Sequence, residues 1–291
     1  MEMVQLIGIG TAYVVMGIIV LLVAKIAADL MTPFSLRSEL TVKDNPAVGL
    51  VLVGYFAGVV IIYLGAVIGP DPEELLSSVE IASMMAVDFA YAIGGILFLN
   101  IGRWVVDRLV LHQFSSVKEI IEDRNVGTGA VECGCLIATA LIVAGAIHGE
   151  SGPEWWAGPI SAIVFFVLGQ MALVAFGWFY QWMTRYDIHA EIEQDNVAAG
   201  AALGFSMLAM GIIVLRAVAG DIESWSETLT WFVIDVAMGF VMLMILRKVT
   251  DALFLPGTTI QHEIATDKNL NAAWIEGTVA TGIAAIIFFV V

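Results

Sequence analysis

The chain has 291 residues, of which 60% are hydrophobic, and its mean hydropathy is +0.92. Soluble domains are about half apolar, so this composition excludes an ordinary water-soluble domain and predicts an integral membrane protein. The formal net charge of −16 fits a surface that concentrates cations, and adaptation to a saline habitat explains it equally well.

Eight apolar stretches follow one another along the chain, each about as long as the 20 residues that a helix needs to cross a bilayer. We therefore expect an all-α membrane protein with transmembrane helices at roughly 4–28, 46–69, 79–106, 126–148, 156–183, 197–220, 227–249 and 271–291. A transmembrane barrel would instead show alternating segments of about ten residues. The first stretch lacks a basic segment and a cleavage pattern, so we interpret it as a permanent span.

Basic residues gather in four of the seven connections. Eleven of the twelve lie in or beside the connections after spans one, three, five and seven, whereas the three opposite loops carry acids and no Lys or Arg. By the positive-inside rule, we expect the four basic connections to be cytoplasmic and both termini to lie outside. The twelfth basic residue, Arg216, lies near the outer end of span six.

One phrase occurs four times, before each even-numbered span: VKDNPAVG, EDRNVGTG, EQDNVAAG and TDKNLNAA. The repeated unit is a span, a connection and a span, and because it holds two spans its copies point the same way. Units two and four also share six polar residues 144 positions apart: Arg103/Arg247, Asp107/Asp251, Glu119/Glu263, Asp123/Asp267, Asn125/Asn269 and Glu132/Glu276. The chain is therefore predicted to be two duplicated four-helix blocks, residues 1–150 and 151–291.

The phrase FSLRSELTVKDNPAVG (Phe34 to Gly49), its echo FSSVKEIIEDRNVGTG (Phe114 to Gly129) and the paired hairpins resemble the YjfL-like family. These are small bacterial inner-membrane proteins known as domain of unknown function 350, and the resemblance covers the whole chain as two tandem copies. Unit three lacks the Phe-Ser pair, and unit four has Thr258-Thr259 there. The resemblance implies the fold and the location but no catalytic residue.

An Asn immediately precedes each even-numbered span. Its side chain can accept a hydrogen bond from an unpaired backbone N–H of the first turn, so we expect helix caps rather than substrate ligands at Asn45, Asn125, Asn196 and Asn269. A Glu stands five or six residues earlier in each unit: Glu39, Glu119, Glu191 and Glu263. We interpret these acids as a solvated face or as partners of nearby Lys and Arg, rather than a ring at an ion entrance.

Small residues recur inside the even-numbered spans. Gly49, Gly129 and Gly200 lie four residues after the Asn, with Ala273 in the fourth copy, and further glycines follow at Gly54, Gly134, Gly204 and Gly277. Small residues let membrane helices approach closely. We therefore expect these positions to serve helix packing, with a flexible gate as the alternative.

Four carboxylates fall within spans: Asp88, Glu132, Asp235 and Glu276. A charged acid at mid-bilayer costs about 2.5–3.5 kcal/mol on insertion scales, so these side chains must face the protein interior or water. Glu132 and Glu276 are expected about 10 Å from the cytoplasmic end, and the two aspartates about 18–22 Å from it. If a pseudo-two-fold axis relates the two blocks, the two acids at each depth would face each other: Glu132 with Glu276, and Asp88 with Asp235. We expect no cationic side chain within the spans to neutralise them.

These acids predict a cation or proton pathway, in a channel or a transporter. The alternative is a non-transporting scaffold or stress-response component, in which protonated carboxyls bond to neighbouring helices and the connections recruit cytoplasmic proteins. A third possibility is a metal site at Glu132 and Glu276 with Cys133 or Cys135 nearby. The two cysteines are two apart on one predicted helix, so we expect no disulfide between them and interpret them as apolar filler.

Enzymatic motifs are missing from the sequence. It has no H-E-x-x-H, no G-x-S-x-G, no P-loop and no glycine-rich dinucleotide fingerprint. We therefore expect no enzyme, no cofactor and no nucleic-acid partner, only the lipid bilayer and the cations, protons or cytoplasmic proteins named above.

Overall fold

Eight long helices form the bulk of the molecule. The computed structural model describes residues 2–69, 77–149, 152, 154–222, 224–254 and 257–290, with the side chains of the first helix from Leu6 onward. The long helices are α1 (Glu2–Met31), α3 (Pro46–Val67), α4 (Ser78–Val105), α6 (Val126–Ala146), α7 (Ala157–Met183), α9 (Val197–Val218), α10 (Trp225–Phe254) and α12 (Leu270–Val290). All are long and apolar enough to cross a membrane. The predicted multi-pass helical fold is therefore confirmed.

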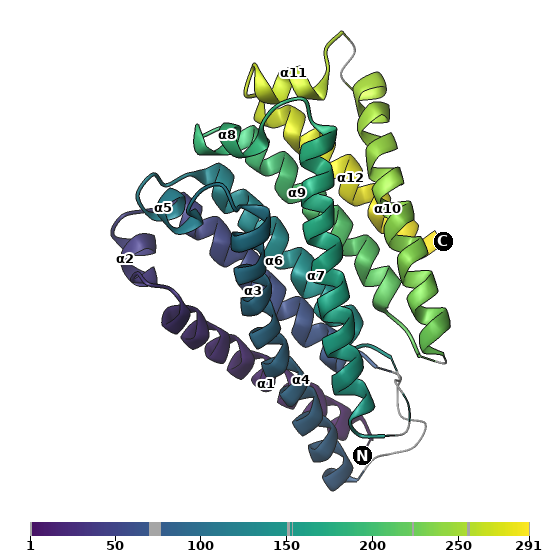
Figure 1. Cartoon of the computed structure of the whole chain (residues 1–291). Helices are drawn as coiled ribbons and strands as arrows, with labels where there is room; N and C mark the ends of the chain where they lie inside the picture. The colour runs from purple at the N-terminus through teal and green to yellow at the C-terminus, as the bar shows by residue number, and fades with distance from the viewer. Residues whose placement is uncertain are drawn as a thin grey trace.

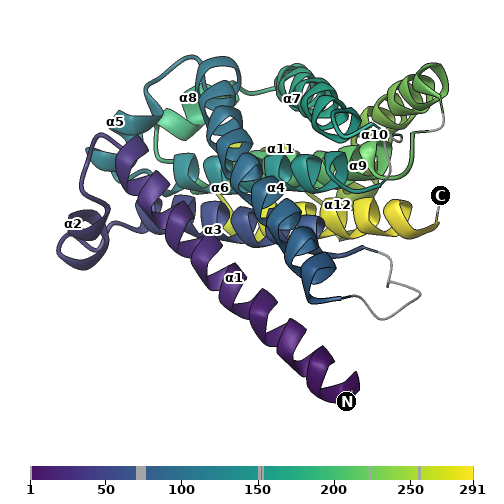
Figure 2. The ribbon, with the colours of Figure 1, turned by 90° about the horizontal axis from the view of Figure 1, so that it is seen from below.

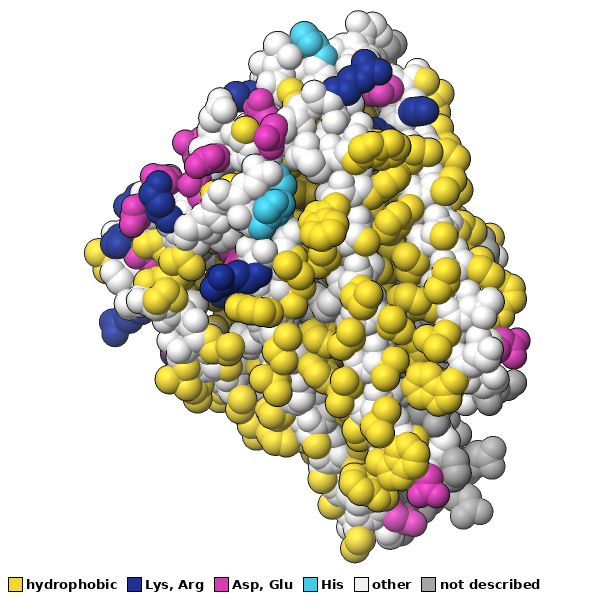
Figure 3. All heavy atoms as spheres, viewed as in Figure 1, with side chains coloured by type: hydrophobic (Ala, Val, Ile, Leu, Met, Phe, Trp, Pro, Cys, Tyr) yellow, Lys and Arg dark blue, Asp and Glu magenta, His cyan; other side chains and the backbone are white. Residues whose placement is uncertain are grey.

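Four short helices of six residues each lie between the two spans of a repeat unit: α2 (Leu36–Thr41), α5 (Ser116–Ile121), α8 (Ile188–Glu193) and α11 (Ile260–Ala265). A five-residue π-helix, η1 (Val106–Val110), continues α4 before α5. The four short helices lie at one end of the bundle, which we call the short-helix end (Figure 1). Lys and Arg side chains gather there, above a broad apolar band (Figure 3). The pattern is that of helices that expose apolar side chains to lipid.

The turn between each short helix and the next span is the same in all four units. The residue before the Asn has a left-handed backbone, with φ of 47°, 55°, 59° and 50° at Asp44, Arg124, Asp195 and Lys268. Non-glycine residues adopt this conformation at a cost of about 1–2 kcal/mol. In return, the backbone N–H of the Asn donates to the carbonyl of the preceding Glu, for example from Asn125 to Glu119 at 2.8 Å. The repeat therefore extends to the backbone dihedral angles.

The even-numbered spans form a single row in chain order. Helix α6 packs between α3 and α9, and α9 packs between α6 and α12. On one side of this row, α4, α7 and α10 each lie against two adjacent members, while α1 lies against α3 and α4. Figure 2 shows α1 diverging from the other helices toward the N-terminus. The predicted facing pairs are therefore wrong, because α9 separates α6 from α12, which carry Glu132 and Glu276.

Glycines bring the helices of the row into backbone contact. A methyl group added at Gly54 would lie 2.6 Å from the Cα of Cys133, and one at Gly134 would overlap the backbone of Gly204. This confirms the predicted packing role, with one exception. Gly49 has nothing within 4 Å of the position of an added methyl group. Between α9 and α12, Gly277 instead packs against the side chain of Phe205. Small residues at all three contacts allow the duplicated blocks to extend a row.

Candidate functional site

Each Asn before an even-numbered span caps that helix, as predicted. The side-chain oxygen accepts from Ala47 N at 3.1 Å in the first unit and from Thr128 N at 3.0 Å in the second. In the third and fourth units it accepts from Ala199 N at 3.2 Å and Asn271 N at 3.0 Å. These bonds satisfy donors that every helix start leaves unpaired.

The same Asn side chains also join neighbouring units. In the first three units, Nδ2 donates to the Glu of its own unit and to a backbone carbonyl of the next short helix. The carbonyl bonds run from Asn45 to Ile120 at 2.9 Å, from Asn125 to Ile192 at 2.6 Å and from Asn196 to Ile264 at 2.8 Å. We call each Asn with its Glu an Asn–Glu clamp. The sequence pattern predicted the cap but not this second role.

The clamp glutamates are not a solvated face. Glu39 and Glu119 are buried, and each accepts from its Asn, at 3.2 and 2.9 Å. The expectation of a basic partner holds for Glu39, which binds Lys43 at 2.6 Å. That hydrogen bond lowers the pKa of Glu39, whereas burial raises the pKa of Glu119. Glu191 and Glu263 are half-buried and bind Asn196 and Asn269, each at 2.8 Å. All four acids therefore hold the turn.

An ion pair between a half-buried Arg and a buried Glu joins α4 to α6. Glu132 is 2% exposed, and its Oε2 accepts from Nε of Arg103 at 3.1 Å and lies 3.1 Å from Nη2. The expectation that no cation within the spans neutralises the acids is therefore wrong. Arg103 was counted with the connection, but α4 and η1 continue the helix to Val110 and keep Arg103 level with Glu132.

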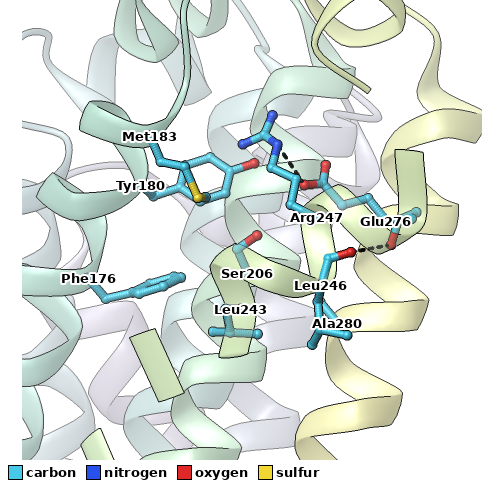
Figure 4. Close-up of a pocket in the computed structure, with 10 residues that line it drawn as sticks. Phe176, Tyr180, Met183, Ser206, Leu243, Leu246, Arg247, Glu276 and Ala280 are labelled. Atoms are coloured by element: carbon cyan, nitrogen blue, oxygen red, sulfur yellow. Dashed lines mark hydrogen bonds and ion pairs between the residues drawn. The ribbon is translucent and has the colours of Figure 1, made fainter. Parts of the chain in front are cut away.

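The same pair recurs between α10 and α12. Nε of Arg247 lies 3.3 Å from Oε1 of Glu276, and the two residues are 6% and 4% exposed. The guanidinium also lies over the ring of Tyr180 from α7, with Cζ 5.2 Å from the ring centroid, which is a cation–π contact. Figure 4 shows these side chains, with Ser206 of α9, around a small cavity.

Arg247 and Glu276 of the second pair line a small cavity of about 10 Å³, and Arg103 of the first pair lines another of the same volume, about the space that one water molecule needs. Buried polar atoms remain without a hydrogen-bond partner among the described residues: Oε1 of Glu132, Oδ1 of Asp107, Oε2 of Glu276 and both Nη atoms of Arg247. Such atoms are costly unless something completes their bonding. Both pairs therefore contain buried polar atoms whose hydrogen bonding is incomplete.

The two sites obtain their phenol from different helices. Tyr55 of α3 lines the cavity beside Arg103, and it accepts from Asn100 at 3.1 Å. Ten residues after the Asn, the third unit has Ser206 in place of Tyr55. In the second site, Tyr180 of α7 supplies the ring. Tyr180 lies four residues before Thr184, and the residue four positions before the matching Thr32 of the first unit is Ala28. An aromatic hydroxyl beside each Arg is thus retained although the residues that carry it differ.

The other two predicted acids lie elsewhere. Asp235 of α10 is buried, and its Oδ2 lies 3.7 Å from Nε of Arg216 on α9. Asp88 of α4 is half-buried and accepts from the hydroxyl of Tyr13 on α1 at 2.8 Å. The four predicted acids therefore share no cavity, since each is bonded to a different neighbouring helix. Arg216 also reaches an acid, although its place near the end of span six suggested that it does not.

The predicted metal possibility receives no support from the side-chain positions. Among the described residues, no group of three or more His, Cys, Asp and Glu lies close enough to hold a metal ion. Cys133 and Cys135 are free, as expected, and Cys135 is buried. Glu132 and Glu276 stand on helices that α9 separates.

Two arginines are the functional candidates that the sequence reasoning missed. Arg103 and Arg247 match at the same offset of 144 as Glu132 and Glu276. An Arg and a Glu duplicated together are a signal of pairing that could have identified both sites. Tyr180 and Tyr55 could not be found in this way, because they are not at equivalent positions.

The comparisons with known proteins agree with the repeat. A family model described as Domain of Unknown Function (DUF350) matches residues 2–147 and again residues 154–291. No curated protein and no solved structure matches the chain. Because the two matches cover nearly all of the sequence, the chain belongs to the DUF350 family and consists of two tandem copies of its domain.

Proposed function

We propose that this membrane protein passes protons across the bilayer, as a channel or a transporter, and that its two Arg–Glu pairs bind the protons. One observation carries the proposal: both domains pair a buried, only partly hydrogen-bonded Glu with an Arg that lines space for about one water. We place the short-helix end in the cytoplasm of a prokaryotic cell, because Lys and Arg gather there.

Stability alone gives a weak reason for these pairs. Replacing a buried ion pair by apolar side chains of similar volume is often neutral or stabilising, by about 1–4 kcal/mol. Hydrogen bonds between membrane helices contribute only about 0.6 kcal/mol on average. Ionisable residues inside a membrane are by default candidates for a pathway. Two copies of the same costly arrangement therefore favour a functional role.

The surroundings of the pairs favour protons over metal cations. A dehydrated cation needs several oxygen ligands in place of its water shell, and each cavity has room for about one water. The guanidinium of Arg247 or Arg103 also repels a cation that approaches the carboxylate. A proton needs only titratable groups and water within hydrogen-bonding distance.

The neighbouring aspartates suggest how a proton is handed on. Asp107 and Asp251 lie four residues after Arg103 and Arg247 on the same helices, where side chains are neighbours. A proton that binds Glu132 removes the charge that holds Arg103, and the guanidinium is then free to pair with Asp107. When Arg103 returns to Glu132, it drives the proton off. The second site works in the same way with Arg247, Glu276 and Asp251.

The test is proton flux into liposomes that contain the purified protein and a pH-sensitive dye. We expect Glu132→Gln with Glu276→Gln to lower the flux at least about tenfold, a change of about 1.4 kcal/mol in the barrier. The matched control is Glu227→Gln, at an exposed acid in the first turn of α10, which should leave the flux unchanged. Equal flux in the double variant and the control would remove the two pairs from the mechanism.

The scaffold alternative is favoured by one observation, the separation of the four acids, each of which is bonded to a different neighbouring helix. It predicts that the wild-type protein carries no more proton flux than empty liposomes. A protein partner would then bind the exposed Lys and Arg of the short-helix end, such as Lys118, because the clamp glutamates are bonded within the chain.

A further inference from the structure

The row of even-numbered helices uses one interface three times. In each instance, the residue nine positions after the Asn of one helix meets the residue eight positions after the Asn of the next. The three pairs are Gly54 with Cys133, Gly134 with Gly204, and Phe205 with Gly277. Above each pair, an Asn–Glu clamp donates to the next short helix. The interface therefore has a defined direction, from one unit to the following unit.

The middle instance of this interface joins the two DUF350 domains. It lies between α6 of the first domain and α9 of the second. Here Gly134 meets the backbone of Gly204, Gly200 meets Gly127, and Nδ2 of Asn125 donates to Ile192 O at 2.6 Å. Two domains of this family thus bind each other through two different surfaces. The first domain contributes its last long helix, and the second domain contributes its second long helix.

The last helix of the chain, α12, presents the first of these surfaces without a partner. Nδ2 of Asn269 donates to Glu263, and among the described residues it makes no second bond to a backbone carbonyl like those of the other three Asn side chains. Gly282 corresponds to Gly58, which packs against Ala140 in the first domain, but nothing lies within 4 Å of a methyl group added at Gly282. Thr278, which corresponds to Gly134, is exposed. This end is complete in its own unit and open toward a next one.

The second helix of the first domain, α3, presents the complementary surface. Gly49 corresponds to Gly129 and Gly200, both of which pack on the backbone of the preceding unit, yet nothing lies within 4 Å of a methyl group at Gly49. Val53, which corresponds to Gly204, is 60% exposed. The carbonyl that would receive Asn269 belongs to Leu40, the counterpart of Ile120 and Ile192.

We propose that the protein associates head to tail with a second copy of itself, with α12 of one copy against α3 of the next, as α6 packs against α9. The two open surfaces complement each other and not themselves, so the partner is another copy in the same orientation. Such heterologous contacts form rings when the rotation closes and open rows when it does not. Helix α1 supports this arrangement. Helices α4, α7 and α10 each lie against two members of the row, whereas α1 lies against one member of the row, α3, and against α4. By the repeat, the second member beside α1 would be the α12 of a neighbouring copy.

Cysteine cross-linking in liposomes tests the contact directly. In a background with Cys133→Ala and Cys135→Ala, Val53→Cys and Thr278→Cys are combined in one chain and oxidised. We expect reducible oligomers, and also a mixed dimer when proteins with one of the two substitutions each are combined. The control pairs Val53→Cys with Ile245→Cys, at an exposed residue of α10 two positions from Arg247. Cross-linking no greater than in this control, or a dimer from Val53→Cys alone, would overturn the proposal.

A second variant tests association without affecting the fold of one chain. Gly282→Leu adds a side chain where a single copy has open space, so it should insert and fold normally but dissociate the oligomer. The matched control is Gly94→Leu on α4, where the space is also open. Counting subunits by photobleaching should give single copies for Gly282→Leu and the wild-type number for Gly94→Leu. Wild-type protein that is already a single copy would refute the inference and leave the proposed proton sites untouched.

Discussion

Removing Arg247 should destabilise the protein far more than removing Arg247 and Glu276 together. At 3.3 Å and an effective dielectric constant of about 20, the attraction between the charges is about 5 kcal/mol. Arg247→Met leaves the carboxylate of Glu276, 4% exposed, without its partner. We expect a loss of about 3–5 kcal/mol in the free energy of unfolding, as for other broken buried pairs.

The double variant Arg247→Met with Glu276→Leu removes both charges and fills a similar volume. Its free energy of unfolding should lie within about 1 kcal/mol of the wild type or above it, because neither charge must then be desolvated. Proton flux should nevertheless fall as in Glu276→Gln. A variant that is stable but inactive would separate the role of the pair in function from any role in stability.

The assay is unfolding in mixed micelles with increasing SDS, followed by tryptophan fluorescence. The control is Lys25→Met, which removes an exposed ion pair with Asp29 at 2.8 Å and should cost less than about 1 kcal/mol. If Arg247→Met costs no more than Lys25→Met, the pair is not a buried ionic contact. If the double variant loses as much as the single one, the pair itself stabilises the fold and the argument for its function fails.

Two further predictions concern the clamps. Asn196→Ala should lower the free energy of unfolding by about 2–4 kcal/mol, because it removes a helix cap and leaves the carbonyl of Ile264 unbonded. Asn269→Ala should lower it by only about 1 kcal/mol, because Asn269 bonds to no following unit. Equal losses in SDS unfolding would contradict the role of the clamp in joining units. Glu119→Gln should stabilise the protein increasingly as the pH rises above the usual value of 4.5, because burial raises the pKa of Glu119 in the folded state and its ionisation therefore opposes folding. Glu39→Gln should have the opposite sign, because the Lys43 hydrogen bond lowers the pKa of Glu39 and its ionised form stabilises the fold, a contribution lost as the pH falls. Unfolding midpoints measured against pH would refute this reasoning if both variants shifted in the same direction.

The amino-acid sequence by itself determined the features that depend on neighbouring residues in the chain. Long apolar runs need lipid wherever the helices lie, so the eight spans could be found with their ends within a few residues. Asn125 caps α6 because a cap and the donor that it satisfies are three residues apart. The duplication was visible because identical polar residues recur at a constant offset.

Only the tertiary structure decided which helices became neighbours and which faces they turned to each other. Glu132 was predicted to meet Glu276, but α9 lies between their helices, in contact with the glycines of α6 and with Gly277 of α12. Arg103 pairs with Glu132 because the rotation of α4 against α6 brings residues 29 positions apart together. The bond from Asn125 to Ile192 spans 67 positions for the same reason. Apolar periodicity carries little information about lateral contacts in a membrane, because lipid and a neighbouring helix satisfy the same side chains.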